Sequence, residues 1–266
     1  MSIALTIAGS DSGGGAGIQA DLKTFAAFGV YGCSAVTAVT AQNTVGVTNI
    51  FEIPNQVIED QIFAVMDDIV PNAIKIGMLS NIAIINTVAQ CLTKIKKTNY
   101  VKVVLDPVMV AKGGDRLLEE NAVNELKELM IPLSDVITPN IPEAETLVKF
   151  SIKNDDDLKN AARFIVDKLG AGSVVIKGGH RTDNKCDDVY FDGHDFQILS
   201  AERIQTKNTH GTGCTFAAAL TANLALNLSI SDILHRSKSY VNECIINAKP
   251  IGQGHGPLNH FPFLNN

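Results

Sequence analysis

The regular alternation of short β-rich runs with helical patterns is the feature that most constrains the fold of this chain. The expected strands cover residues 4–9, 33–42, 73–78, 102–107, 135–140 and 173–178. Most of these runs are almost continuously apolar, which is typical of strands covered on both faces of a sheet. The expected helices cover residues 16–28, 55–69, 81–96, 119–130, 142–147 and 155–169. This order predicts an α/β fold with a mostly parallel central sheet and helices on both sides.

The pattern changes in the last third of the chain. Residues 186–199 contain two β-type runs around Asp192-Gly193, which is typical of a hairpin. Residues 211–248 indicate two helices, and the uncharged, Ala- and Leu-rich stretch 217–226 predicts that the first of them is buried. No linker, repeat or low-complexity segment interrupts the 266 residues, so we expect one domain over residues 1–266.

Charge and cysteine content narrow the class of function. The 22 basic and 28 acidic residues give a net charge of −6, which argues against a surface that binds nucleic acid or anionic membranes. The five cysteines are scattered and form no C-x-x-C pair, which disfavours a disulfide framework or a zinc site and favours a reducing compartment. No segment approaches the ~20 apolar residues of a membrane span, and no signal-peptide pattern is present. We therefore expect a cytoplasmic protein.

Ligands of open α/β sheets gather beyond the carboxyl ends of the strands. Several residues with unusual chemistry fall at those ends in this sequence. They are Gly9, Gln42, Met78, Asp106, Asn140, Glu143 and Lys177. Because all of these residues fall at the same edge of the expected sheet, we expect the ligand site at that edge.

The first glycine-rich segment, residues 10–17, follows a strand and opens a helix. Its Gly15-x-Gly17-x-x-Ala20 spacing satisfies a relaxed dinucleotide fingerprint, but the acidic residue required at the end of the second strand is missing. The Walker pattern is also absent, because the sequence contains no Gly-Lys pair. A plain tight turn explains many such loops. We favour instead a backbone that allows a flat substrate to approach closely.

The segment 208–215 gives a sharper signal, because two glycines and a cysteine precede an apolar helix. Backbone N–H groups of Gly211, Thr212 and Gly213 at a helix start favour an anion. Cys214 lies in the first turn, where we expect the helix dipole to lower the thiol pKa. Its thiolate could accept a hydroxyl proton while the amides hold the transferred phosphoryl group. The alternative is a capped helix start with a small buried cysteine.

Phosphoryl transfer also requires cations. Lys177, at the end of an apolar strand, is suited to contact a phosphate, although it could simply extend from the strand end towards water. Asp106 and the pair Asn140 and Glu143 offer oxygen ligands suited to Mg²⁺, directly or through water. Glu143 could alternatively complement a helix N-terminus. The six histidines show no spacing typical of metal ligands.

These motifs occur together in one known family. The segments are residues 8–17, 40–44, 75–79, 105–109, 138–143, 177–179, 210–215 and the tail 254–260. In this order, and over essentially the whole chain, the sequence resembles hydroxymethylpyrimidine/phosphomethylpyrimidine kinases, the thiamine-biosynthesis branch of the ribokinase superfamily.

The resemblance implies a ribokinase-like three-layer α/β/α domain, a homodimer, and ATP and Mg²⁺ as cofactors. It implies two successive phosphorylations, of 4-amino-5-hydroxymethyl-2-methylpyrimidine and then of its monophosphate. Gln42 would hydrogen-bond the aminopyrimidine, and Gly9, Met78 and Val108 would line the ring pocket.

The resemblance also assigns the phosphate end of the site. Lys177 would contact the ATP phosphates. Asn140 and Glu143 match the N-x-x-E motif that the superfamily associates with Mg²⁺. Residues 211–214 would form the anion hole, with Cys214 where sugar-kinase relatives carry an aspartate base.

Three alternatives compete with this interpretation. A pyridoxal kinase of the same superfamily is the nearest, and Gln42 argues against it because a side-chain amide offers both a donor and an acceptor to an aminopyrimidine. A nicotinamide-dependent oxidoreductase would use the first glycine loop but leaves residues 211–214 unexplained. A ligand-binding protein without catalysis would be expected to have lost Lys177, Glu143 or Cys214.

Overall fold

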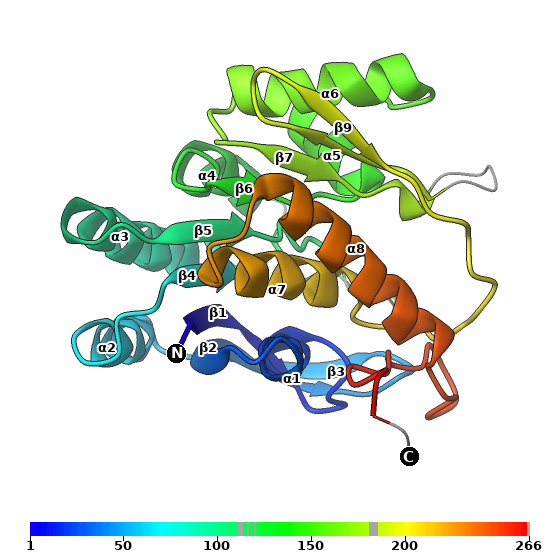
Figure 1. Ribbon diagram of the computed structural model, residues 1–266. Coiled ribbons are helices and arrows are strands. Elements are labelled where there is room, and N and C mark those ends of the chain that lie inside the picture. The colour runs from blue at the N-terminus through cyan, green and yellow to red at the C-terminus, as the bar shows by residue number, and fades with distance from the viewer. Residues whose placement is uncertain (111–113, 116, 120, 181–185, 265–266) are drawn as a thin grey trace.

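The computed structural model describes residues 1–110, 114–115, 117–119, 121–180 and 186–264 (Figure 1). These residues form one nine-stranded sheet with the order β3-β2-β1-β4-β5-β6-β7-β8-β9. The strands are β1 (Ile3–Asp11), β2 (Tyr31–Gln42), β3 (Val47–Glu52), β4 (Ala73–Ile76), β5 (Lys102–Leu105), β6 (Val136–Ile137), β7 (Val174–Ile176), β8 (Asp188–Phe191) and β9 (Phe196–Leu199).

The central strands are parallel, as the sequence predicts. Strand β1 pairs in parallel with β2 and β4, and β4 to β7 continue the parallel order. Strands β7, β8 and β9 pair antiparallel, which confirms the expected hairpin. Strand β3 was not expected; it runs antiparallel to β2 at the edge of the sheet. Its residues are mostly exposed, so they carry no alternating apolar pattern.

The helices are α1 (Gly17–Ala27), α2 (Asn55–Met66), α3 (Ile82–Thr98), α4 (Ala122–Glu125), α5 (Ile141–Val148), α6 (Asp155–Asp167), α7 (Thr212–Ala225) and α8 (Ile230–Ile246). A π-helical segment, Leu126–Met130, continues α4, and Gly178–His180 form a 3₁₀ turn. The helix expected over residues 119–130 therefore begins later than predicted, and its residue 120 lies outside the described residues.

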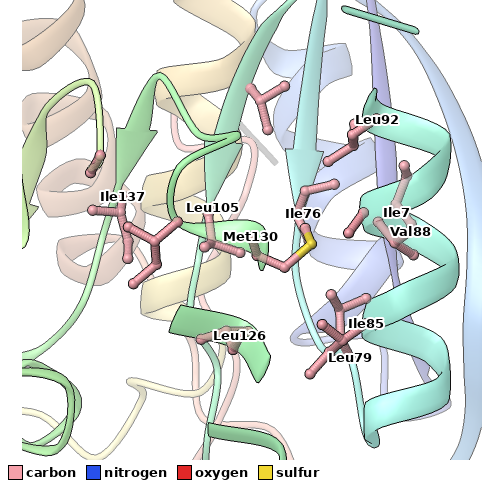
Figure 2. Close-up of a cluster of buried hydrophobic side chains, with 14 of the residues drawn as sticks. Ile7, Ile76, Leu79, Ile85, Val88, Leu92, Leu105, Leu126, Met130 and Ile137 are labelled. Atoms are coloured by element: carbon pink, nitrogen blue, oxygen red, sulfur yellow. The ribbon is translucent and has the colours of Figure 1, made fainter. Parts of the chain in front are cut away.

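Helices cover both faces of the sheet, with a large core on one face and two adjoining smaller clusters on the other. Helices α2 to α6 enclose the larger core, where Ile7, Ile76 and Leu105 of the sheet meet Ile85 and Val88 of α3 (Figure 2). Helices α1, α7 and α8 cover the opposite face (Figure 1). Helix α7 is buried along most of its length, as its uncharged sequence predicts. No helix in the described ranges is long and apolar enough to cross a bilayer.

The strand order defines where a ligand can bind. The chain leaves β1 for β2 on one side and returns to β4 on the other, so the connections diverge at β1. A crevice forms at the carboxyl ends of strands at such a switch point. Gly9 lies near the end of β1, and Met78 follows β4. The topology therefore brings the predicted residues to one place.

Candidate active site

A cavity of about 610 Å³ opens at the carboxyl ends of the parallel strands. All the residues predicted for the site line it: Gly9, Gln42, Met78, Asp106, Val108, Asn140, Glu143, Lys177, Gly211, Thr212, Gly213 and Cys214. They come from segments up to 205 positions apart in the chain, from Gly9 to Cys214, and the sheet topology brings them together. Its volume is within the range of small-molecule and cofactor sites.

The glycine loop (residues 10–17) is wrapped around the carboxylate of Asp11. Asp11 Oδ1 accepts a hydrogen bond from the amide of Gly13 at 2.8 Å, and Oδ2 accepts from Gly15 at 3.0 Å and Ala16 at 2.8 Å. The amides that a dinucleotide fingerprint offers to a pyrophosphate are thus used by a side chain of the loop itself. This geometry argues against the oxidoreductase alternative and leaves the loop as a wall for the substrate.

His210 joins the glycine loop to residues 211–214, the segment that the sequence predicts to form an anion hole and that is called the anion-hole segment below. Its Nε2 atom lies 2.8 Å from Asp11 Oδ2, and both side chains are buried. The ring packs so closely on Gly15 that a Cβ atom there would collide with it. Gly211 has φ +80°, and a Cβ atom on it would overlap the carbonyl oxygen of Gly15. Both glycines are therefore required for the two loops to touch.

The anion-hole segment opens helix α7, as expected. The hydroxyl of Thr212 donates to the carbonyl of Thr209 at 2.7 Å, which fixes the turn before the helix. Cys214 lies in the first turn of α7 and lines the cavity. The expected direction of its pKa is wrong for the ligand-free protein: burial raises the thiol pKa to about 11, and the negative charges of Asp106 and Asp21 act in the same direction. Burial outweighs the positive charge of Lys75 and a hydrogen bond with the backbone of Gly17, both of which lower the pKa.

Lys177 and Asp106 form an ion pair beside the anion-hole segment. Lys177 Nζ lies 2.9 Å from Asp106 Oδ1, and the hydroxyl of Thr138 lies 3.2 Å from the same oxygen. A Cβ atom at Gly213 would lie 3.2 Å from Lys177 Nζ, so the absence of a side chain leaves the ammonium group close to the backbone of the anion-hole segment. This arrangement places a cation where the sequence predicts phosphate contacts.

Asn140 and Glu143 cap helix α5. The Asn140 side chain accepts from the amide of Glu143 at 2.9 Å, and Glu143 Oε2 accepts from the amide of Asn140 at 2.8 Å. This capping box is the alternative role that the sequence left open for Glu143. Burial raises the pKa of Glu143 to about 7; Lys177 opposes this shift and Asp106 adds to it. The pair is thus structural in the ligand-free protein.

The donor set fits Mg²⁺ held mainly through water and phosphate. In the described part of the chain, no three His, Cys, Asp or Glu side chains gather as a metal cage. Asp106 and Glu143 line the cavity, but each carboxylate already has a partner within the protein. Mg²⁺ normally retains several waters and uses one or two carboxylates with substrate phosphates. Asp106 and Glu143 could therefore contact the waters of a bound Mg²⁺ while keeping their partners within the protein.

The part of the cavity next to helix α8 contains residues that the sequence did not predict. Arg203, Lys238 and the apolar side chains Phe216, Val241 and Ile245 line it. Lys238 Nζ lies 2.7 Å from Asp188, whose other oxygen accepts from the amide of Gly178 at 2.9 Å. These residues belong to no compact motif, because one face of helix α8 supplies three of them. Only the fold shows that this face meets the cavity.

The fold and the site together define a small-molecule kinase with a ribokinase-like architecture. The cavity reaches the start of helix α7, where backbone N–H groups and the ammonium group of Lys177 lie together, an arrangement suited to phosphoryl transfer. The chain belongs to the phosphomethylpyrimidine kinase family, whose sequence profile matches residues 11–259.

Individual relatives agree with this assignment. The chain is 52% identical to the hydroxymethylpyrimidine/phosphomethylpyrimidine kinase of Bacillus subtilis, covering 99% of this chain and 96% of the relative. A crystal structure of phosphomethylpyrimidine kinase from Clostridium difficile matches with a TM-score of 0.81 at 43% identity, covering 92% and 100% of the two chains. An ADP complex of Bacillus subtilis pyridoxal kinase matches with a TM-score of 0.89 at 41% identity, covering 98% and 97%.

Proposed function

We propose that this chain, acting as one catalytic domain, transfers a phosphoryl group from ATP to 4-amino-5-hydroxymethyl-2-methylpyrimidine and then a second one to its monophosphate, supplying the diphosphate for thiamine biosynthesis. The observation that carries the proposal is the position of Gln42 and the anion-hole segment on one cavity. One end offers an amide to a pyrimidine, and the other offers backbone N–H groups to a phosphoryl group.

The substrate end has the shape for a flat ring. A Cβ atom at Gly9 would lie 3.1 Å from the Sδ atom of Met78, so a larger residue would close the space between them. Val108 and Gln42 complete this part of the lining. The Oε1 atom of Gln42 lies 3.1 Å from the hydroxyl of Thr40, which restrains the amide. The amide can then both donate to and accept from the polar edge of an aminopyrimidine.

The phosphate end supplies charge stabilisation and proton removal. Amides of Gly211, Thr212 and Gly213 would hold the transferred group, and Lys177 would neutralise the ATP phosphates. Cys214 would accept the proton of the attacking hydroxyl. Because burial raises the thiol pKa to about 11, the thiol is mostly protonated before ligands bind, and nearby cations must assist proton transfer. Mg²⁺ would neutralise phosphate charge, with Asp106, Asn140 and Glu143 contacting its waters.

The proposal includes a homodimer in the cytoplasm. A surface on the β2–β3 hairpin supports the dimer: Val39 and Phe51 are paired neighbours, exposed to 46% and 67%. Exposed apolar neighbours on an edge hairpin are suited to burial against a second copy. Sedimentation equilibrium tests this part, with Phe51→Glu expected to shift the species towards the monomer. The cytoplasmic location rests on the scattered cysteines of the sequence.

A pyridoxal kinase activity is the second candidate, because a solved pyridoxal kinase shares the fold at 41% identity. Gln42 favours the pyrimidine as the better substrate. The test is an ATP- and Mg²⁺-dependent assay that offers hydroxymethylpyrimidine, its monophosphate and pyridoxal in parallel, with products identified by mass spectrometry. Two sequential phosphate additions to the pyrimidine support the proposal. Turnover of pyridoxal alone would overturn the substrate assignment but not the kinase assignment.

A further inference from the structure

His210 makes contacts on three sides, although the phosphoryl-transfer chemistry described above gives it no task. Its ring hydrogen-bonds Asp11 at 2.8 Å and packs on Gly15 of the glycine loop. Its amide donates to the carbonyl of Gly256 at 3.0 Å, in the C-terminal strap (residues 252–260). Along the chain it directly precedes Gly211 of the anion-hole segment. The exposed fraction of His210 is 7%, and the residue also lines the cavity.

One set of contacts connects His210 to Gln42 through the glycine loop. The hydroxyl of Ser12, next to Asp11, donates to the backbone carbonyl of Gln42 at 2.7 Å and accepts from the backbone N–H of Gln42 at 2.8 Å. The backbone of the pyrimidine-recognising residue is thus held by the loop whose central carboxylate holds His210.

A second set of contacts reaches the same hairpin through the C-terminal strap. The amide of His255 donates to the carbonyl of Thr44 at 2.9 Å, and the amide of Gly254 lies 3.2 Å from the Thr44 hydroxyl. Thr44 is two residues beyond Gln42. Together, these hydrogen bonds and the short chain segments between them form a closed ring. His210 is the member of the ring that adjoins the anion-hole segment.

We propose that His210, held by Asp11, is a positioning residue that fixes the distance between the pyrimidine hydroxyl and the phosphoryl group at residues 211–214. The inference rests on the proposed function of that segment. In-line transfer requires the reacting atoms to be about 3–3.5 Å apart, and a displacement of about 1 Å can lower a rate by about 10²-fold. A hydrogen-bonded link between the two ends of the cavity prevents that displacement.

The link should also decide which molecule accepts the phosphoryl group. If the substrate end moves away from the anion hole, space opens for water at the phosphoryl group. Water then attacks ATP to give ADP and inorganic phosphate, without phosphorylation of the alcohol. The ratio of ADP formed to alcohol phosphorylated therefore measures positioning, whereas a loss of folded protein lowers both products together.

The experiment compares His210→Gln with His210→Asn. The glutamine amide nitrogen can reach the position of Nε2 and donate to Asp11, whereas the asparagine side chain is too short. We expect His210→Asn to lower kcat for the alcohol about 10–100-fold with a smaller change in KM, and to raise the ADP-to-product ratio severalfold. His210→Gln should recover most of the wild-type rate and ratio.

Ser134→Ala is the matched control, because it removes a buried hydrogen bond of 2.7 Å, to the carbonyl of Met130, just before strand β6 and outside the residues that line the cavity. It should leave the ratio unchanged. Equal rates and ratios for the Gln and Asn variants, or an equal loss of ADP and product in His210→Asn, would overturn the positioning role. The alcohol used is whichever one the wild-type enzyme phosphorylates. Failure of the wild type with hydroxymethylpyrimidine would therefore be a separate result, against the proposed substrate alone.

Discussion

Lys75 Nζ lies 2.9 Å from Asp21 Oδ2, and neither side chain is exposed to solvent. The lysine comes from strand β4 and the aspartate from helix α1, and Thr6 of β1 donates to the same carboxylate oxygen at 2.6 Å. The pair therefore ties one covering helix to the two strands at the switch point. Removing one partner of such a pair leaves an uncompensated buried charge.

Lys75→Met should lower the free energy of unfolding by about 3–5 kcal/mol, because Asp21 remains buried without its counter-charge. Urea unfolding followed by circular dichroism measures this loss. The double variant Lys75→Met/Asp21→Asn should recover much of the stability, since no charge is then left buried. A single variant that is as stable as the wild type would contradict the prediction.

Cys214→Ala should lower kcat by about 10²–10⁴-fold, the usual contribution of a positioned general base, with little effect on substrate binding. Because burial raises the thiol pKa to about 11 in the free protein, the thiolate fraction grows with pH throughout the neutral range. Wild-type kcat/KM, which reports protonation in the free enzyme, should therefore rise from neutral to alkaline pH, and this rise should be lost in the variant. Steady-state kinetics across pH measure both effects. Near-normal turnover of Cys214→Ala would leave the backbone anion hole as the main contributor.

The sequence predicted the parallel strands because burial on both faces imposes apolar runs that are visible without a structure. Strand β3 escaped prediction because an exposed edge strand has no such run. In the site, the residues close to strand ends were predicted, since topology alone places them. The hydrogen bond between Asp11 and His210 joins positions 199 residues apart, and no local pattern predicts it. The direction of the Cys214 pKa was wrong because the sequence shows the helix start but not the depth of burial.

Gln42→Ala should raise KM for the pyrimidine about 10–100-fold, corresponding to about 1–3 kcal/mol for leaving the polar ring edge without its hydrogen-bond partner. The effect on kcat should be smaller, because the amide lies at the substrate end of the cavity. Gln42→Glu is the matched control for shape: it keeps the acceptor atoms and loses the donor. Comparing the two variants separates the loss of the hydrogen-bond donor from the loss of side-chain packing. An unchanged KM in Gln42→Ala would remove this residue from substrate recognition.

His260 offers a test of how the C-terminal strap is held. Its Nε2 atom lies 3.0 Å from the hydroxyl of Thr215 in helix α7, and its carbonyl accepts from Tyr240 at 2.7 Å. Burial, with a smaller effect of the positive charge of Lys23, lowers the pKa of His260 from 6.5 to about 4. The folded protein therefore keeps this ring neutral at pH values where the unfolded chain protonates it.

The sign of the resulting pH dependence follows from proton binding. Between about pH 6.5 and about pH 4 the unfolded chain binds more protons at this residue than the folded protein, so lowering the pH over this range favours unfolding. The full loss is on the order of 3 kcal/mol for a shift of this size. Carboxylates such as Asp11, whose pKa is lowered despite burial by its bonds to His210 and to loop amides, act mainly below this window. Glu143, whose pKa burial raises to about 7, acts within the window in the opposite direction, because there the folded protein binds the additional proton. His260→Gln should therefore lose less of its urea midpoint on acidification than the wild type does, whereas His235→Gln, at an exposed position, should behave like the wild type. The same slope in wild type and His260→Gln would show that the strap is not held by a neutral buried histidine.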